Sequence, residues 1–356
     1  MKSLNIPKID TRDKRFDVLK AIGLLCIILA HVHPPEVIRQ LRNFDVPLMV
    51  VISGALFGLS YSGKNISYLE YAKKRIKRLA VPTWTFLIIF YVVAYIVCML
   101  VNYPFRFSVD TILSSFALIW GFGYVWIIRV FLLMALIAPF VFAMNKRLEY
   151  NHEYFGSILA IYALYEIFAY HYTFFGIPLL DGFIEYVIMY AVPYGCMFAL
   201  GLRLPQLANR TIDLIAALFF VIFTMLAVIN CDIYFVPIQT AKYPPMLYYL
   251  SYSVLVSMLL YRFVNTKYAN VLKNDWLVFI SSSSLWIYLW HVLIVYAWNF
   301  YVMKMPYWLD NFVMMFAVVF SISFAITYIQ KIIVQNMMIS EHQFPGKKLL
   351  IDIFRQ

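Results

Sequence analysis

Charged residues are scarce in this chain. Only 13% of its 356 residues are Asp, Glu, Lys or Arg, whereas 63% are hydrophobic. A soluble protein of this length could not bury so much apolar surface, so lipid must cover much of it. The composition excludes a soluble enzyme. It predicts an all-α, polytopic membrane protein with one domain over residues 1–356 and no appended soluble domain.

Cysteine is also rare, and the four thiols are scattered along the chain. Three of them fall within apolar runs, and the spacing matches neither a disulfide framework nor a set of metal ligands. We therefore expect no metal site. The four residues are Cys26, Cys98, Cys196 and Cys231.

Acidic residues are fewer than basic ones, which gives a formal net charge of +11. In a membrane protein the positions of Lys and Arg are more informative than their sum. Here they cluster in short loops between apolar runs, as the positive-inside rule expects. The distribution of charge therefore indicates how the chain is oriented in a lipid bilayer, and it does not indicate a nucleic-acid partner.

The basic N-terminal segment resembles the start of a signal peptide. No small-x-small cleavage site follows His33, however, so we expect the first span to be retained.

The apolar runs predict ten membrane spans, since a span needs roughly 20 apolar residues. Placing both termini in the cytoplasm puts most Lys and Arg residues on the cytoplasmic side. A shorter run near 111–122 is interrupted by Gly121 and Gly123, and we expect it to be re-entrant or interfacial. The predicted spans are 18–35, 46–61, 80–101, 124–144, 155–172, 184–202, 212–230, 246–263, 277–300 and 309–336.

Two histidines, His31 and His291, lie away from the ends of predicted spans, where ionisable residues are costly and indicate function. His31 and His291 each lie about 14 residues after a cytoplasmic span start, so two helices would bring them to a similar depth. A histidine there suits general base catalysis on a hydroxyl, although both residues could instead pack between helices. Asp17 lies about 21 Å from His31 along a straight helix and cannot orient it.

A basic segment runs from Lys73 to Arg78, ahead of Pro82. Its simplest interpretation is a topological anchor. Arg75 and Arg78, at i and i+3, also share one helix face and can offer two guanidinium groups to phosphates. A coenzyme A thioester would fit such a site.

Other polar positions allow more than one interpretation. Ser53 lacks the Gly-x-Ser-x-Gly context of a catalytic serine, so Ser53-Gly54 predicts a close helix contact. His33 could be a solvated surface residue. Arg129 could extend to the interface or meet Glu166, and the Lys242–Pro245 segment could end a loop or bind an acceptor.

These motifs together resemble acyltransferase family 3, a family of membrane O-acyltransferases. The resemblance covers nearly the whole chain and depends on the order and spacing of several segments. These are Asp17-x-Leu19-Lys20 with His31, Pro47-Leu48-Met49-x-x-x-Ser53-Gly54, Arg75-x-x-Arg78, Trp126 with Pro139, and Ser283-x-x-x-Ile287-Tyr288-Leu289-x-His291.

The resemblance implies acyl transfer from a cytoplasmic acyl-CoA, usually acetyl-CoA, to a hydroxyl of a surface polysaccharide or lipid-linked sugar, as in O-antigen modification at the bacterial inner membrane. By this resemblance His31 matches the family's essential histidine and His291 its late histidine, and we assign both to catalysis. We assign the donor to Arg75 and Arg78 together with Lys74, Arg15, Asp17 and Lys20. We assign the acceptor to His33, Asp45, Ser53, Arg129, Glu166 and Lys242.

The sequence departs from the family pattern at three places. Lys20 stands where Arg is usual, Val18 where Gly is common, and Met49-Val50 replaces Phe-Phe. Lys20 keeps the charge but loses the bidentate geometry of Arg.

Two rival functions remain at this point. One is a polysaccharide or lipid transporter, in which the intramembrane polar residues line a pathway; it predicts an inverted repeat, which the sequence does not show. The other is an acyltransferase that acts on peptidoglycan or a small molecule.

Overall fold

The computed structural model describes residues 12–64, 67–119, 121–231, 236–301, 311–339 and 348–354, and all regular structure in these ranges is helical. The all-α prediction is confirmed. The terminal residues, and the first two residues of the predicted span 309–336, lie outside the described ranges. The cytoplasmic location of both termini therefore stays a prediction.

Each of the ten predicted spans coincides with a helix or a helix combination. The single helices are α1 Lys14–Ala30, α3 Asp45–Tyr61, α4 Tyr68–Leu100, α6 Trp126–Arg147, α7 Asn151–His171, α10 Asn209–Ile229, α11 Leu247–Val264 and α14 Phe312–Ile339. The combinations are α8 Pro178–Phe183 with the π-helix η1 Ile184–Ile188 and α9 Met189–Arg203, and α12 Asp275–Ser282 with α13 Ser284–Tyr301. The short elements are α2 Glu36–Leu41, α5 Val109–Phe116, η2 Leu204–Gln206, η3 Ile238–Ala241, η4 Lys267–Leu272 and α15 Lys348–Phe354.

Seven of the described helices are long and apolar enough to cross a membrane, or eight if α12 and α13 form one span. The helices α1 and α7 are not among them, so the count of ten stays a prediction. Helix α5 has only eight residues, or about 12 Å, which is far short of the hydrocarbon thickness. This length agrees with the expectation that the 111–122 segment does not cross as a helix.

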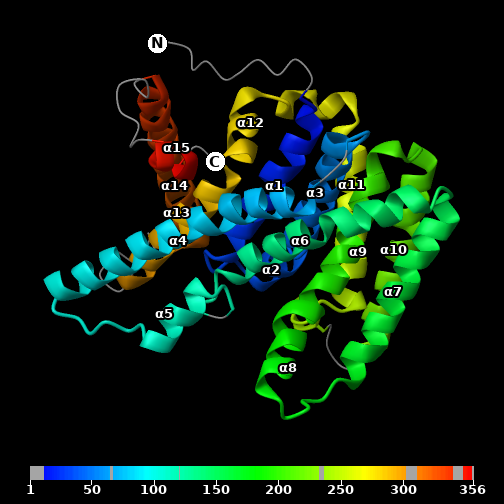
Figure 1. Cartoon of the computed structure of the whole chain (residues 1–356), viewed down its shortest axis with the longest axis horizontal. Helices are drawn as coiled ribbons and strands as arrows, with labels where there is room; N and C mark the ends of the chain where they lie inside the picture. Colours follow the sequence, from blue (N-terminus) through cyan, green and yellow to red (C-terminus); the bar gives the residue numbers. More distant parts are fainter. Residues whose placement is uncertain are drawn as a thin grey trace.

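Side-chain contacts identify two opposite ends of the bundle. Lys14 at the start of α1 pairs with Asp275 at the start of α12, 3.0 Å apart. We call this end the basic end, because the Lys73–Arg78 segment of α4 also lies there. At the opposite end, His33 contacts Asn299 near the end of α13. In Figure 1, α4 runs along the long axis of the molecule, with α14 above it and the α7–α10 group to its right.

Close helix contacts hold the centre of the bundle together. Helix α3 packs against both α1 and α9, and α9 also packs against α6. A Cβ atom on Gly54 would collide with the backbone carbonyl of Phe198, and one on Gly201 with that of Val51. The α3–α9 contact therefore requires glycine on both sides, which confirms the close helix contact predicted at Ser53-Gly54.

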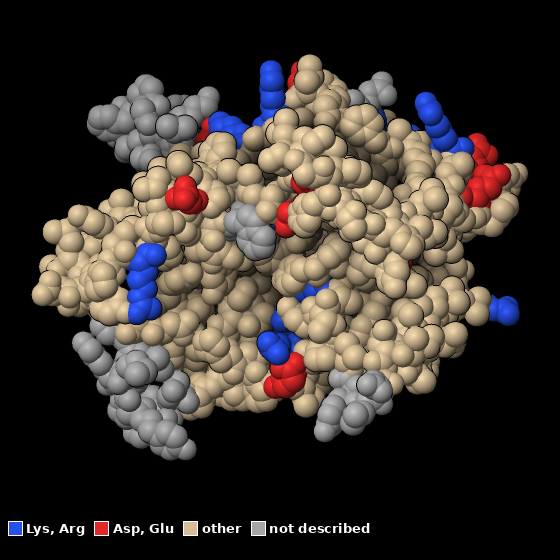
Figure 2. Space-filling model, turned by 90° about the horizontal axis from the view of Figure 1, so that it is seen from below, with Lys and Arg blue, Asp and Glu red and all other residues tan. Residues whose placement is uncertain are grey.

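The surface seen in Figure 2 is mostly uncharged, with isolated acidic and basic side chains. Large hydrophobic side chains are exposed along α4, α7 and α10, including Ile88, Leu164 and Val228. Such a surface is stable only in contact with lipid. The chain is an integral membrane protein.

Candidate active site

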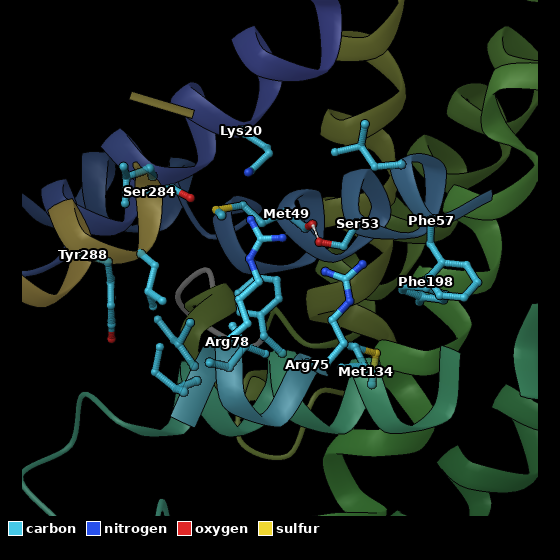
Figure 3. A pocket seen from close by; sticks show the side chains of 18 of the residues that line it. Lys20, Met49, Ser53, Phe57, Arg75, Arg78, Met134, Phe198, Ser284 and Tyr288 are labelled. Carbon is cyan, nitrogen blue, oxygen red and sulfur yellow. Dashed lines mark hydrogen bonds between the residues drawn. The ribbon is translucent and has the colours of Figure 1, made fainter. Parts of the chain in front are cut away.

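A cavity of about 330 Å³ opens at the basic end of the bundle. Its walls come from α1, α3, α4, α6 and α9, and from the point where α12 meets α13. Three cations line it: Lys20, Arg75 and Arg78. Figure 3 shows both arginines extending from α4 toward Lys20 of α1 and Ser53 of α3. We call it the cationic cavity.

Local structure explains why these three side chains converge. Arg75 and Arg78 are one helical turn apart, and the Arg75 guanidinium lies 5.2 Å from the centre of the Tyr71 ring. On the other wall, α12 and α13 meet at a bend of 75°. This bend leaves the backbone carbonyl of Ser281 free to accept a 3.0 Å hydrogen bond from Lys20 Nζ.

The cationic cavity is electrostatically unbalanced. No Asp or Glu lies among its lining residues, and no described carboxylate pairs with Lys20, Arg75 or Arg78. Three cations that repel one another across a confined space favour an anionic ligand, and guanidinium groups pair well with phosphates.

Lys74 is exposed on another face of α4 and does not line the cavity. Our grouping of Lys74 with the arginine pair is therefore not supported by its position.

Two other residues assigned to the donor, Arg15 and Asp17, stabilise the start of α1. Asp13 caps this helix by accepting a hydrogen bond from the backbone N–H of Arg15. The Arg15 side chain also binds Asp13 and Asn265. Asp17 accepts two hydrogen bonds from Arg12, which raises the pKa of the Arg12 guanidinium. Neither residue lines the cationic cavity, and the ion-pair partner of Asp17 is Arg12.

The two predicted histidines meet just beyond the inner end of the cavity, next to its lining residue Tyr288. His31 Nδ1 lies 3.0 Å from His291 Nε2, and the two rings are stacked. His291 is fully buried, while His31 is half-buried. The sequence predicted that two helices would bring these residues to a similar depth, and the structure brings them into direct contact.

The hydrogen-bond partners assign the protons of this pair. His291 Nδ1 contacts the backbone carbonyl of Tyr288, which can only accept, so Nδ1 carries the proton. The Nε2 atom of neutral His291 then accepts from His31 Nδ1–H. The lone pair of His31 is consequently on Nε2, the atom free to act as a base or nucleophile.

The ring of Tyr124 packs against both histidines. Its ring centre lies 4.7 Å from that of His31 and 6.1 Å from that of His291. The hydroxyl of Tyr288 donates to the backbone carbonyl of Tyr124 over 2.5 Å. These contacts fix the segment before α6 against α13 and hold the His31 ring in place.

A buried charge cluster, comprising Arg42, Asp45 and Lys242, lies near His31. Arg42 donates to Asp45 over 2.8 Å, and Lys242 Nζ lies 3.8 Å from the same carboxylate. All three side chains are almost completely buried, and both cations act electrostatically on His31. The cluster has one excess positive charge. Asp45 and Lys242 were predicted site residues, whereas Arg42 was not, although its i, i+3 spacing to Asp45 is a signal for an ion pair.

Ser53 and His33, also assigned to the acceptor, each have a polar partner within the protein. Ser53 donates to the Met49 carbonyl, and it lines the cationic cavity. His33 is exposed and contacts Asn299 at 3.3 Å. Their roles in acceptor binding stay predictions.

Arg129 and Glu166 do not meet, so that alternative is wrong. Arg129 donates to the carbonyl of Ile119 and lies over the ring of Tyr190. Glu166 accepts from the backbone N–H of Leu247, at the start of α11. Neither residue lines the cationic cavity.

No cluster of three or more His, Cys, Asp or Glu residues that could hold a metal ion occurs within the described ranges. The site brings together a buried histidine pair, three cations that line one cavity, and a charge cluster with one excess positive charge.

The sequence was compared with known proteins and protein families. No curated protein and no solved structure gives a significant match. The family model described as an acyltransferase domain matches residues 13–329, which include all the residues of the cationic cavity and both histidines. This match confirms the resemblance to acyltransferase family 3 seen in the sequence. The chain is a membrane acyltransferase and belongs to this family.

Proposed function

We propose that this protein is an O-acetyltransferase that moves an acetyl group from cytoplasmic acetyl-CoA to a sugar hydroxyl of a surface polysaccharide or of its lipid-linked precursor. The observation that supports it best is the cationic cavity, where three cations without carboxylate partners lead toward a histidine pair. Family membership favours this enzyme over the rival transporter. The site would lie in the bacterial inner membrane, with the basic end facing the cytoplasm.

In this proposal, the donor enters the cationic cavity from the basic end. Arg75 and Arg78 bind its phosphates through paired N–H groups, while Lys20 supplies a third charge deeper in the bundle. The pantetheine arm and thioester then extend between apolar side chains toward Tyr288 and the histidines. Binding energy from the distant phosphates positions the thioester for reaction.

His31 Nε2 removes the proton of the acceptor hydroxyl as its oxygen attacks the thioester carbonyl carbon. The C–O bond forms, a tetrahedral oxyanion develops, and the C–S bond then breaks. The CoA thiolate leaves and takes the proton back from His31. His291 accepts the Nδ1–H bond throughout and holds the reactive tautomer, and the excess positive charge of the Arg42, Asp45 and Lys242 cluster favours the oxyanion.

The test is the ester content of the surface polysaccharide from cells that express the wild type or His31→Ala at equal membrane levels. We expect an acetyl mass increment only with the wild type, since loss of a general base lowers the rate by on the order of 10²-fold or more. An increment that survives the substitution would move the base elsewhere. The absence of any increment with folded wild type in its native host would favour another acceptor or the transporter.

A further inference from the structure

A second cavity, of about 470 Å³, lies between the late part of α4, the segment before α5, and α13. It is separate from the cationic cavity, and the two share no lining residue. Six of its lining residues are aromatic: Phe90, Tyr103, Phe107, Tyr124, Tyr296 and Phe300. We call it the aromatic cavity.

The aromatic cavity approaches the histidine pair from the side opposite the basic end. Its inner end includes Tyr124, whose ring lies 4.7 Å from His31. Its outer end includes Asn299, which contacts His33. Along α13 it extends from Leu293 to Phe300, or roughly 10 Å. A ligand as long as one sugar ring and its attached phosphate would reach from the mouth to His31.

The walls define the chemistry of that ligand. Aromatic faces are apolar but carry a negative quadrupole, so they suit the C–H faces of a sugar ring. The cation among the lining residues is Arg106, which lies over the Tyr103 ring at 4.7 Å and pairs with no carboxylate in the described part of the chain. An exposed guanidinium at a cavity mouth near the membrane surface favours a phosphate.

The α4 wall of the cavity continues onto a surface that faces lipid. Val93 and Val97 line the cavity, while their neighbours Val92, Ile96 and Leu100 are exposed. An apolar chain attached to the phosphate could therefore lie along α4 without entering the cavity. This continuity favours an acceptor carried on a membrane lipid over a free sugar.

We propose that the aromatic cavity binds the acyl acceptor as a lipid-linked sugar phosphate, with its phosphate on Arg106 and its hydroxyl directed past Tyr124 to His31. This inference rests on the proposed function and adds the acceptor site to it. Donor and acceptor then occupy different cavities on opposite sides of the histidine pair, and neither needs to leave before the other binds.

Cys98 provides a direct measurement of binding, because it is half-buried and lines the aromatic cavity. The variant that keeps Cys98 as its only thiol is labelled in detergent with a water-soluble methanethiosulfonate reagent. The matched control keeps only the exposed Cys231 of the same chain. Three probes are compared: the lipid-linked glycan fraction extracted from native host membranes, the same glycan after mild acid removes the lipid phosphate, and geranyl phosphate without a sugar.

We expect the intact fraction to slow Cys98 labelling at least fivefold, to leave Cys231 labelling unchanged, and to lose its effect when Arg106→Gln is added. Arg210→Gln, at an exposed arginine on α10, should retain the effect. Equal protection by the acid-treated glycan would overturn the phosphate contact. Equal protection by geranyl phosphate would make the cavity a lipid site, and no protection by any probe would overturn the proposal.

A second pair of variants separates this inference from the proposed function. Ala94→Trp places an indole in the aromatic cavity, whereas Ala163→Trp places one on the lipid-facing side of α7. We expect Ala94→Trp to lose acetyl transfer to the extracted fraction while it still binds acetyl-CoA, and Ala163→Trp to retain both. Transfer that survives Ala94→Trp would refute the acceptor site alone. Cys98 protection without any transfer by the wild type would refute the proposed function and leave the binding site standing.

Discussion

His31 Nδ1 lies 3.0 Å from His291 Nε2, although 260 residues separate the two histidines in the chain. His291 in turn contacts the carbonyl of Tyr288, one helical turn earlier on α13. The two contacts form a chain of hydrogen bonds that ends at His31. In the proposed mechanism His291 is therefore a positioning residue, whose buried ring fixes the tautomer of its half-buried partner.

We predict that His291→Gln retains more activity than His291→Ala. The glutamine amide oxygen can still accept the His31 Nδ1–H bond, whereas alanine leaves that donor unpaired in a buried site. The measurement is steady-state kinetics on purified protein, with kcat and the KM for acetyl-CoA determined separately. We expect kcat to fall by on the order of 10²-fold for alanine, with KM little changed. Equal loss in both variants would show that His291 does more than accept one hydrogen bond.

We predict that Arg75→Gln and Arg78→Gln each raise the KM for acetyl-CoA. Each substitution removes a charged hydrogen bond to phosphate, worth about 1.5–3 kcal/mol, which corresponds to roughly a 10- to 100-fold change in affinity. The neighbouring Lys73 is exposed and does not line the cationic cavity, so Lys73→Gln is the control. A similar rise in KM for all three variants would show that overall surface charge, and not the two arginines of the cavity, determines the affinity for acetyl-CoA.

The α3–α9 contact makes a prediction about stability. Gly54→Ala forces a Cβ against the Phe198 carbonyl, and such overpacking costs about 1–3 kcal/mol. In α7, a Cβ on Gly156 would meet nothing within 4 Å, so Gly156→Ala should be neutral or gain up to about 1 kcal/mol in helix propensity. Thermal unfolding in detergent compares them. Equal midpoints for both variants would mean that the two helices can separate freely at Gly54.

Glu166 allows a direct test of a role predicted from sequence. Its carboxylate accepts from the Leu247 N–H and from the Tyr162 hydroxyl. If Glu166 caps α11, Glu166→Ala should lower the unfolding free energy by about 1 kcal/mol and leave the KM for the acceptor unchanged. A raised acceptor KM at unchanged stability would instead support the substrate-binding role assigned from the sequence.

Much of this protein follows from local pattern. Runs of apolar residues determine where helices form in lipid, because a backbone in hydrocarbon must satisfy its own hydrogen bonds. His31 and His291 also stood out, because titratable groups are costly in a membrane. Arg75 and Arg78 stood out because their i, i+3 spacing places two guanidinium groups on one helix face. Several segments that include these residues together resemble acyltransferase family 3, and the family-model match over residues 13–329 confirmed the resemblance.

The sequence alone could not pair side chains across the bundle. Arg129 and Glu166 looked like partners by depth, yet each binds backbone atoms nearby. Lys74 stood beside the arginine pair in sequence, but the helix turns it away from the cavity. Arg42 lies between the first two predicted spans and was not a predicted site residue. In the structure it is buried and pairs with Asp45, which Lys242 also approaches. Helical periodicity determines which residues share a face, but only the packing of the helices decides what that face meets.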